Sequence, residues 1–209
     1  MDDFDVHNYS SDISSYTQQV HGWMNQTGHG SYPLWLSEWA TYRGGYENVS
    51  TALGTVLDNL VRGSRSGNDH IDGSHLFTFY DWGGFSGGFQ NFEGLVGPSG
   101  AKLKSFYALR MGTRALKGCR PTYQATTSTS NLLAIATTDA TGAVYLLVIN
   151  DGRSSQTVDA NLSALKTTGT GTQWQLDATH DDTVVANPSL SNGHVTLSMP
   201  KMAAVLLKF

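Results

Sequence analysis

The feature that most constrains this chain is a change in its hydrophobic pattern near residue 118. Before that point, short apolar runs alternate with segments whose apolar residues recur at spacings of three and four, the period of a helix. After it, β-favouring runs follow one another between turn signals. We therefore expect two units: residues 1–117, with alternating strands and helices, and residues 118–209, built of strands.

The first unit is predicted to contain three strands, each followed by a helix. The strands are expected at residues 4–7, 34–37 and 76–80, and the helices after Asp12, over residues 48–62 and over about residues 101–116. Three successive βα units predict parallel strands joined by right-handed crossovers. The positions expected to face the core include Ile13, Tyr16, Val20 and Trp23 in the first helix, and Leu103, Phe106 and Leu109 in the last.

The second unit is predicted to be an antiparallel β-sandwich. Its β-rich runs include residues 132–138, 143–150, 157–162, 172–176, 195–198 and 203–209. Turn signals lie between them, notably at residues 150–152 and at Asn192-Gly193. About seven short strands over some 90 residues are typical of a sandwich. The expected fold class is therefore α/β plus all-β.

Charge and motif content exclude several classes of function. A net charge of -4 argues against nucleic acid as the main partner, because that would need a basic face. No apolar run approaches the roughly 20 residues needed to cross a bilayer, so no membrane partner is expected. The histidines and aspartates at residues 69–72 and 180–182 lack a recognised metal-ligand spacing, so we interpret them as solvated loop residues. No metal or cofactor is expected.

A single carboxylate is the best candidate for chemistry. The apolar stretch 34–37 ends in Glu38, which is flanked by Trp39. The carboxyl ends of parallel strands form the active face of α/β barrels, so this position suits a catalytic acid. Only two other glutamates occur, Glu47 and Glu93.

Three strand-end motifs resemble the C-terminal part of clan A retaining glycoside hydrolases, with families 39 and 30 looking most similar. They are DVHNY at residues 5–9, LWLSEW at residues 34–39 and FTFYDW at residues 77–82, in the order of barrel strands six, seven and eight. The resemblance covers essentially the whole chain. It implies a partial (β/α)8-type barrel of about three βα units followed by a β-sandwich, and a secreted or periplasmic location, although residues 1–3 show no signal-peptide pattern.

The resemblance also implies roles for individual residues. Glu38 matches the nucleophile, and Asp81 is the first candidate within the chain for the acid/base. Carbohydrate contacts are expected from His7, Tyr9, Trp39, Tyr80 and Trp82. The Asn-Glu pair that supplies the family's acid/base does not occur here, so Glu93, Glu47 and a residue from a second chain stay open as alternatives.

Two functions follow as hypotheses. The first is a glycosidase that cleaves β-linked sugars by a retaining mechanism, with Glu38 as nucleophile. The second is a non-catalytic carbohydrate-binding remnant, or a fragment of a longer enzyme. Because three parallel strands cannot close on themselves, we also expect a homo-oligomer that covers the open edges of the partial barrel.

Overall fold

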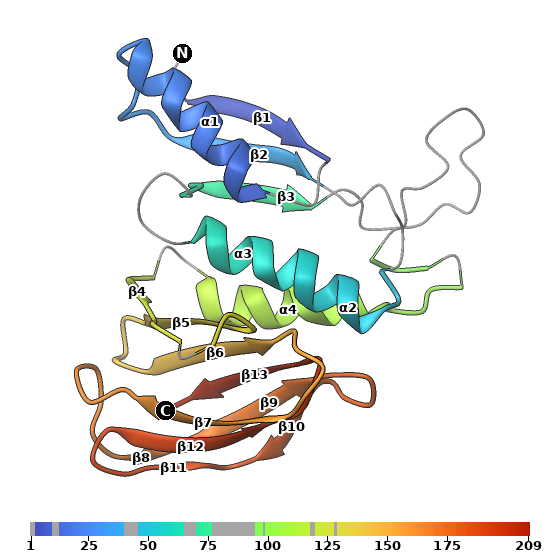
Figure 1. Cartoon of the computed structure of the whole chain (residues 1–209), viewed down its shortest axis with the longest axis vertical. Coiled ribbons are helices and arrows are strands. Elements are labelled where there is room, and N and C mark those ends of the chain that lie inside the picture. Colours follow the sequence, from blue (N-terminus) through green and yellow to red (C-terminus); the bar gives the residue numbers. More distant parts are fainter. Residues whose placement is uncertain are drawn as a thin grey trace.

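The computed structural model describes residues 3–9, 13–39, 46–64, 70–76, 95–97, 99–117, 120–127 and 129–209. Tyr80, Asp81, Trp82 and Glu93 lie outside the described residues, as does most of the strand predicted at residues 76–80. The chain is a mixed α/β protein with several sheets and few helices. Figure 1 shows its helices and strands stacked in layers.

The N-terminal half contains a three-stranded parallel sheet in the order β1-β2-β3. The strands are β1 (Phe4–Asn8), β2 (Leu34–Trp39) and β3 (Gly73–Leu76). Helix α1 (Ile13–Gln26) connects the first two strands. A continuous helical stretch connects β2 to β3 and consists of α2 (Val49–Thr51), the π-helical η1 (Ala52–Leu57) and α3 (Asp58–Gly63). Helix α4 (Lys104–Leu116) follows.

The C-terminal half is antiparallel and forms two layers. A six-stranded sheet has the order β10-β9-β13-β6-β5-β4, and the pairs β12-β7 and β11-β8 lie beside it. The strands are β4 (Thr122–Gln124), β5 (Leu132–Thr138), β6 (Val144–Asn150), β7 (Gln156–Asn161), β8 (Gly169–Thr170), β9 (Thr172–Leu176), β10 (Asp181–Ala186), β11 (Ser189–Leu190), β12 (His194–Met199) and β13 (Ala203–Lys208). Of these, β4, β8, β10 and β11 were not among the predicted runs.

The central strands of the six-stranded sheet are buried on both faces, which explains their continuous apolar runs. One face packs under η1, α3 and α4 through residues such as Leu147 and Leu206. The other face packs on β7 and β12 through residues such as Leu146 and Leu207. All of β6 is buried, whereas β12 alternates between exposed and buried residues because only one of its faces is covered.

The turn predicted at Asn192-Gly193 is confirmed. Both residues have positive φ, 50° and 81°, and the backbones of Ser191 and His194 bond each other across the turn. This is the type I′ geometry whose twist suits a two-residue hairpin, and asparagine and glycine adopt it at low cost. The Asn-Gly dipeptide alone was therefore sufficient to predict this turn.

The buried faces of two helices differ from the prediction. In α1, Ile13, Val20 and Met24 are buried, but Trp23 is 53% exposed. In α4 the buried positions include Ala108 and Met111, whereas Phe106 and Leu109, and Leu103 just before the helix, are only half-buried. The small residues of α4 face the core because the helix stretch before β3 approaches closely: a Cβ on Gly112 would lie 2.6 Å from a Leu60 methyl carbon.

Candidate active site

Glu38 lies near the carboxyl end of β2 and contacts two residues from the neighbouring strand end. The Tyr9 hydroxyl donates a hydrogen bond to Glu38 Oε2, and His7 Nδ1 lies 3.6 Å from the same oxygen. The Glu38 side chain is 37% exposed and the His7 side chain 52% exposed. The structure therefore brings together three of the predicted site residues, at an edge that solvent can reach.

A β-bulge at Ser37 sets the direction of the Glu38 side chain. Val6 pairs with Leu36 and His7 pairs with Glu38, so β2 carries one extra residue at this point, and its register against β3 also shifts there. Before the bulge, the buried Leu36 packs toward the helices; after it, Trp39 does so. Because side chains alternate along a strand, the bulge leaves Glu38 on the face opposite the helices.

Trp35 shares that face, and the sequence analysis did not include it among the candidate site residues. It alternates with the buried Leu34 and Leu36, so its indole lies on the side of the sheet away from the helices. Its ring crosses β3 above Gly73, where a Cβ would approach within 2.3 Å, and its centroid lies 6.1 Å from that of His75. The strand alternation in residues 34–36 was the available signal.

Trp39 is a correction to the predicted set of sugar-contacting residues. It is 2% exposed and belongs to the core cluster beneath the helices. An indole buried to this degree has almost no face to offer a ligand. The physical reason is the bulge at Ser37, which turns Trp39 inward and Glu38 outward.

Of the remaining predicted site residues, only Glu47 belongs to the described part of the chain. Tyr80, Asp81 and Trp82 lie outside the described residues, as does Glu93. Glu47 is exposed and accepts a hydrogen bond from the neighbouring Asn48 side chain at 3.0 Å. Within the described ranges, the recorded polar partners of Glu38 are Tyr9 and His7.

Comparison with solved structures reveals the fold of the chain. No protein-family model matches it, and no curated protein matches its sequence. A family 30 endoxylanase from Clostridium papyrosolvens C71 superposes with a TM-score of 0.75 at 17% identity, over 100% of this chain and 48% of that one. A glucosidase from Croceicoccus marinus superposes with a TM-score of 0.74 at 14% identity, over 100% of this chain and 53% of that one. A family 51 arabinofuranosidase from Xanthomonas axonopodis pv. citri superposes with a TM-score of 0.67 at 14% identity, over 100% of this chain and 52% of that one.

The chain has a glycoside hydrolase fold. Family 30 enzymes are among the matching structures, as the resemblance of the strand-end motifs indicated. Each identity is below 25%, so the likeness is one of fold. The chain spans about half the length of these matching structures.

Within this glycoside hydrolase fold, the described residues can support one part of the expected chemistry. A carboxylate that accepts a hydrogen bond from a phenol is held in one orientation, as a nucleophile requires. A retaining reaction also needs a second carboxyl group about 5–5.5 Å away, to protonate the leaving group.

The described part of the chain holds no cluster of three or more histidine, cysteine, aspartate or glutamate side chains suited to a metal ion. Nor does it contain a helix long and apolar enough to span a bilayer.

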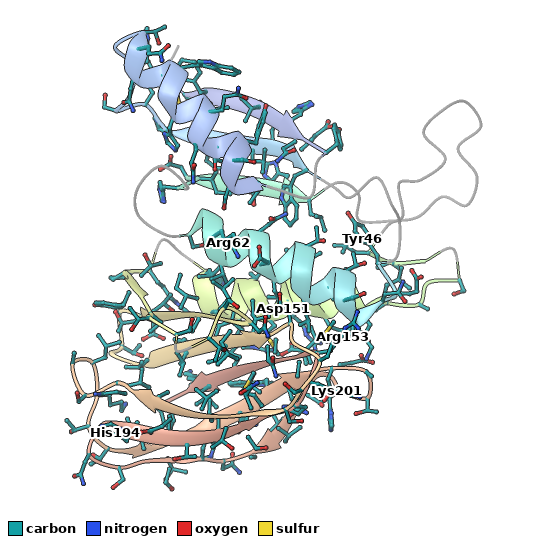
Figure 2. The ribbon with its side chains drawn as sticks, in the orientation of Figure 1. Tyr46, Arg62, Asp151, Arg153, His194 and Lys201 are labelled. Atoms are coloured by element: carbon teal, nitrogen blue, oxygen red, sulfur yellow. The ribbon has the colours of Figure 1, made fainter. Side chains whose placement is uncertain are left out.

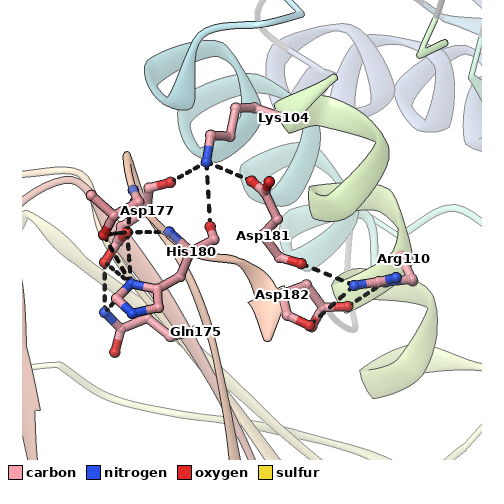
Figure 3. A network of polar contacts seen from close by, with 8 residues as sticks. Lys104, Arg110, Gln175, Asp177, His180, Asp181 and Asp182 are labelled. Carbon is pink, nitrogen blue, oxygen red and sulfur yellow. Dashed lines mark hydrogen bonds and ion pairs between the residues drawn. The ribbon is translucent and has the colours of Figure 1, made fainter. Parts of the chain in front are cut away.

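A second polar cluster lies away from Glu38, where α4 meets β9 and β10 (Figure 3). Lys104 Nζ donates to the Asp177 carbonyl at 2.7 Å and to the Asp181 carboxylate at 2.5 Å. Arg110 and Arg114 both donate to the carboxylate of Asp182, at 2.6 Å and 2.5 Å. The interpretation of residues 180–182 as solvated loop is therefore wrong for Asp182, which is 3% exposed. These contacts fasten the last helix to the C-terminal layers.

Asp177 stabilises the turn that presents this cluster. Its Oδ1 accepts hydrogen bonds from the backbone N–H groups of Thr179 and His180, at 2.7 Å and 2.8 Å, and its Oδ2 accepts one from Gln175 at 2.5 Å. Burial is the largest single influence on the Asp177 pKa and raises it. The hydrogen bonds from Gln175, Thr179 and His180 together outweigh burial and hold that pKa well below its usual range.

Two further polar contacts involve Arg62 and Tyr46. Arg62 on α3 pairs with Asp58 one turn earlier, at 2.6 Å, and its position is labelled in Figure 2. Tyr46, also labelled there, is 1% exposed, and its carbonyl accepts the Ser105 N–H at the start of α4. The Arg62 pair lies within one helix, and the Tyr46 contact joins the residues just before α2 to the start of α4.

Proposed function

We propose that this chain carries the nucleophile of a retaining glycosidase that acts on β-linked sugars, with Glu38 as that nucleophile. The observation that carries the proposal is the Tyr9–Glu38 hydrogen bond at the carboxyl ends of adjacent parallel strands, with His7 beside it. The glycoside hydrolase fold of the chain supports it, since the superposed xylanase and glucosidase are sugar-cleaving enzymes by their names.

The proposed division of roles follows from the geometry and the resemblance. Tyr9 positions the Glu38 carboxylate, and His7 is exposed enough to contact a sugar hydroxyl. Trp35 is added as a candidate for apolar contact with a sugar, because its indole lies on the same face of the sheet as Glu38. Tyr80 and Trp82 stay predicted carbohydrate contacts, and Asp81 stays the first candidate for the acid/base.

We interpret the two halves as the last three βα units of a barrel, residues 1–117, and a β-sandwich, residues 118–209. The parallel order β1-β2-β3 and the two antiparallel layers support this interpretation. It gives Glu38 the position that catalytic residues occupy in such barrels, at the carboxyl end of a strand.

The decisive experiment removes the need for a proton donor. In a β-glycoside of dinitrophenol, the dinitrophenolate leaves without general acid assistance. A lone nucleophile can therefore still form the glycosyl-enzyme ester. We expect the intact mass of the chain to rise by one 2-fluoroglycosyl unit when such an activated 2-fluoroglycoside is supplied, with peptide mapping locating the label on Glu38. Glu38→Gln should not be labelled, whereas Glu47→Gln should be labelled like the unchanged chain. If Glu38→Gln were labelled as fully as the unchanged chain, Glu38 would not be the nucleophile.

A non-catalytic carbohydrate-binding role, or a role as part of a longer enzyme, is the second candidate. Two observations favour it. This chain covers only about half the length of the matching structures, and its described part contains a parallel sheet of three strands. Titration calorimetry with β-linked oligosaccharides tests it. Binding without any labelling or turnover favours this role, and specific labelling of Glu38 excludes a purely non-catalytic one.

A further inference from the structure

His7 faces the Glu38 carboxylate through one of its two ring nitrogens. Its Nδ1 lies 3.6 Å from Glu38 Oε2, and in the described part of the chain this is the recorded polar contact of the His7 side chain. The rings of His7 and Tyr9 stand at 83° to each other with their centroids 6.2 Å apart, so both residues reach Oε2 without stacking. Because 52% of its side chain is exposed, His7 can present the second nitrogen, Nε2, to a bound substrate.

The position of Nε2 suits the second catalytic group of a retaining reaction. A retaining enzyme holds its acid/base about 5–5.5 Å from its nucleophile. Nε2 is separated from Nδ1 by the width of one imidazole ring, so its distance from Glu38 Oε2 exceeds 3.6 Å by at most that width. The interval includes the separation that the reaction requires.

The charge beside His7 changes during the proposed reaction. The other described titratable groups on or beside this face of the parallel sheet are Asp3, Asp5, Tyr9, Glu38 and His75. Asp3 and Asp5 lie further back along the chain, and Glu38 is the carboxylate that contacts the ring. A Glu38 carboxylate attracts an imidazolium, whereas an uncharged Glu38 ester does not. The ring therefore loses its counter-ion as the ester forms, at the point where the leaving group needs a proton.

We propose that His7 is the acid/base of the retaining reaction and acts through Nε2. The assignment rests on the proposed function, because it requires Glu38 to be the nucleophile, and it competes with Asp81, the candidate from the sequence. In the first step, Nε2 gives its proton to the glycosidic oxygen. The bond from that oxygen to the anomeric carbon breaks while a Glu38 oxygen bonds to the same carbon.

The second step reverses the direction of proton transfer. Neutral Nε2 takes a proton from water, and the water oxygen bonds to the anomeric carbon as the Glu38 ester bond breaks. The carboxylate and the imidazolium are both restored, and the sum of the two steps is hydrolysis.

Two β-glycosides of the sugar that labels Glu38 test the assignment in the full chain. The phenyl glycoside needs protonation of its leaving group, whereas the dinitrophenyl glycoside does not. His7→Gln should lower kcat/KM for the phenyl glycoside by about 100- to 10,000-fold, the usual contribution of a general acid, and should leave kcat/KM for the dinitrophenyl glycoside largely unchanged. The matched control is His194→Gln, which should change neither value, because His194 is 49% exposed and pairs with Asp159 at 3.3 Å.

Azide tests the second step, because this anion attacks the glycosyl ester without the help of a base. With the dinitrophenyl glycoside as substrate, azide should raise kcat of the His7→Gln chain and yield a β-glycosyl azide. The unchanged chain should not be accelerated, and Glu38→Gln should form no azide product. A histidine that merely contacts a sugar hydroxyl would not produce this response.

Labelling by the activated 2-fluoroglycoside separates a failure of His7 from a failure of Glu38. If no sugar labels Glu38, both assignments fail. If Glu38 is labelled but the chain hydrolyses neither glycoside, or if His7→Gln affects the two glycosides equally, His7 is not the acid/base and Glu38 keeps its role. A loss confined to the phenyl glycoside in Asp81→Asn, with none in His7→Gln, would assign proton transfer to Asp81 instead.

Discussion

The Tyr9 hydroxyl donates a hydrogen bond to the Glu38 carboxylate from one residue beyond the end of β1. The two residues are 29 positions apart in the sequence and meet because β1 and β2 pair in parallel. The bulge at Ser37 then directs Glu38 toward Tyr9 and buries Trp39. This one contact ties the proposed chemistry to the sheet geometry.

Removal of the Tyr9 hydroxyl should impair turnover without removing the nucleophile. A hydrogen bond to a charged group is worth about 1.5–3 kcal/mol, so Tyr9→Phe should lower kcat/KM for an activated aryl β-glycoside by about 10- to 150-fold. Steady-state kinetics on the same substrate measure the effect, with Tyr123→Phe on the exposed β4 as the control. An unchanged kcat/KM would mean that the hydroxyl does not position Glu38 during the reaction.

Gly73 is required to leave room for Trp35. A Cβ at position 73 would lie 2.3–2.6 Å from three atoms of the indole ring, so Gly73→Ala should displace the ring and destabilise the fold by about 1–3 kcal/mol. Urea unfolding followed by circular dichroism measures this. Gly22→Ala in α1, where a Cβ meets nothing within 4 Å, should instead stabilise by about 0.5–1 kcal/mol. A Gly73→Ala chain as stable as the unchanged one would contradict the packing of Trp35.

Asp182 should contribute to stability through both arginines of α4. It has a φ of 53°, which asparagine also tolerates, so Asp182→Asn removes the charge without straining the backbone. Arg110 and Arg114 keep partial contact with water, and we therefore expect a moderate loss of about 1–3 kcal/mol in the free energy of unfolding. Asp159→Asn, at a pair in which both side chains are well exposed, should change stability by less than about 1 kcal/mol. Similar losses from the two substitutions would argue against the role assigned to Asp182.

The lowered pKa of Asp177 predicts a loss of stability in acid. A group whose folded pKa lies below its unfolded value stabilises the fold above the unfolded value, about 3.9 for aspartate, and that contribution is lost as the pH falls further. Asp177→Asn should therefore lower the free energy of unfolding at neutral pH and lessen its decline below about pH 4. Urea unfolding at a series of pH values compares the two chains. Parallel pH profiles would show that Asp177 does not couple protonation to folding.

Much of the secondary structure followed from local signals in the sequence. Runs of β-favouring residues between turn signals identified β7 and β12, and the Asn192-Gly193 dipeptide identified the turn before β12. Helical spacing identified α1 and α4. Strand β10 was missed because Asp181 and Asp182 at its start are typical of solvated loops, and only their pairing with α4 accounts for their position.

The sequence alone determined the alternation of strands and helices before residue 118, the longer strands after it and the prominence of Glu38, because these depend on neighbouring residues and on a recognisable motif. The tertiary structure decided which side chains meet. Trp23 was expected in the core and is exposed, whereas Trp39 was expected near a ligand and is buried. Both outcomes depend on which distant element covers a given face, and on a one-residue bulge that reverses the direction of every side chain after it. Local periodicity contains neither piece of information.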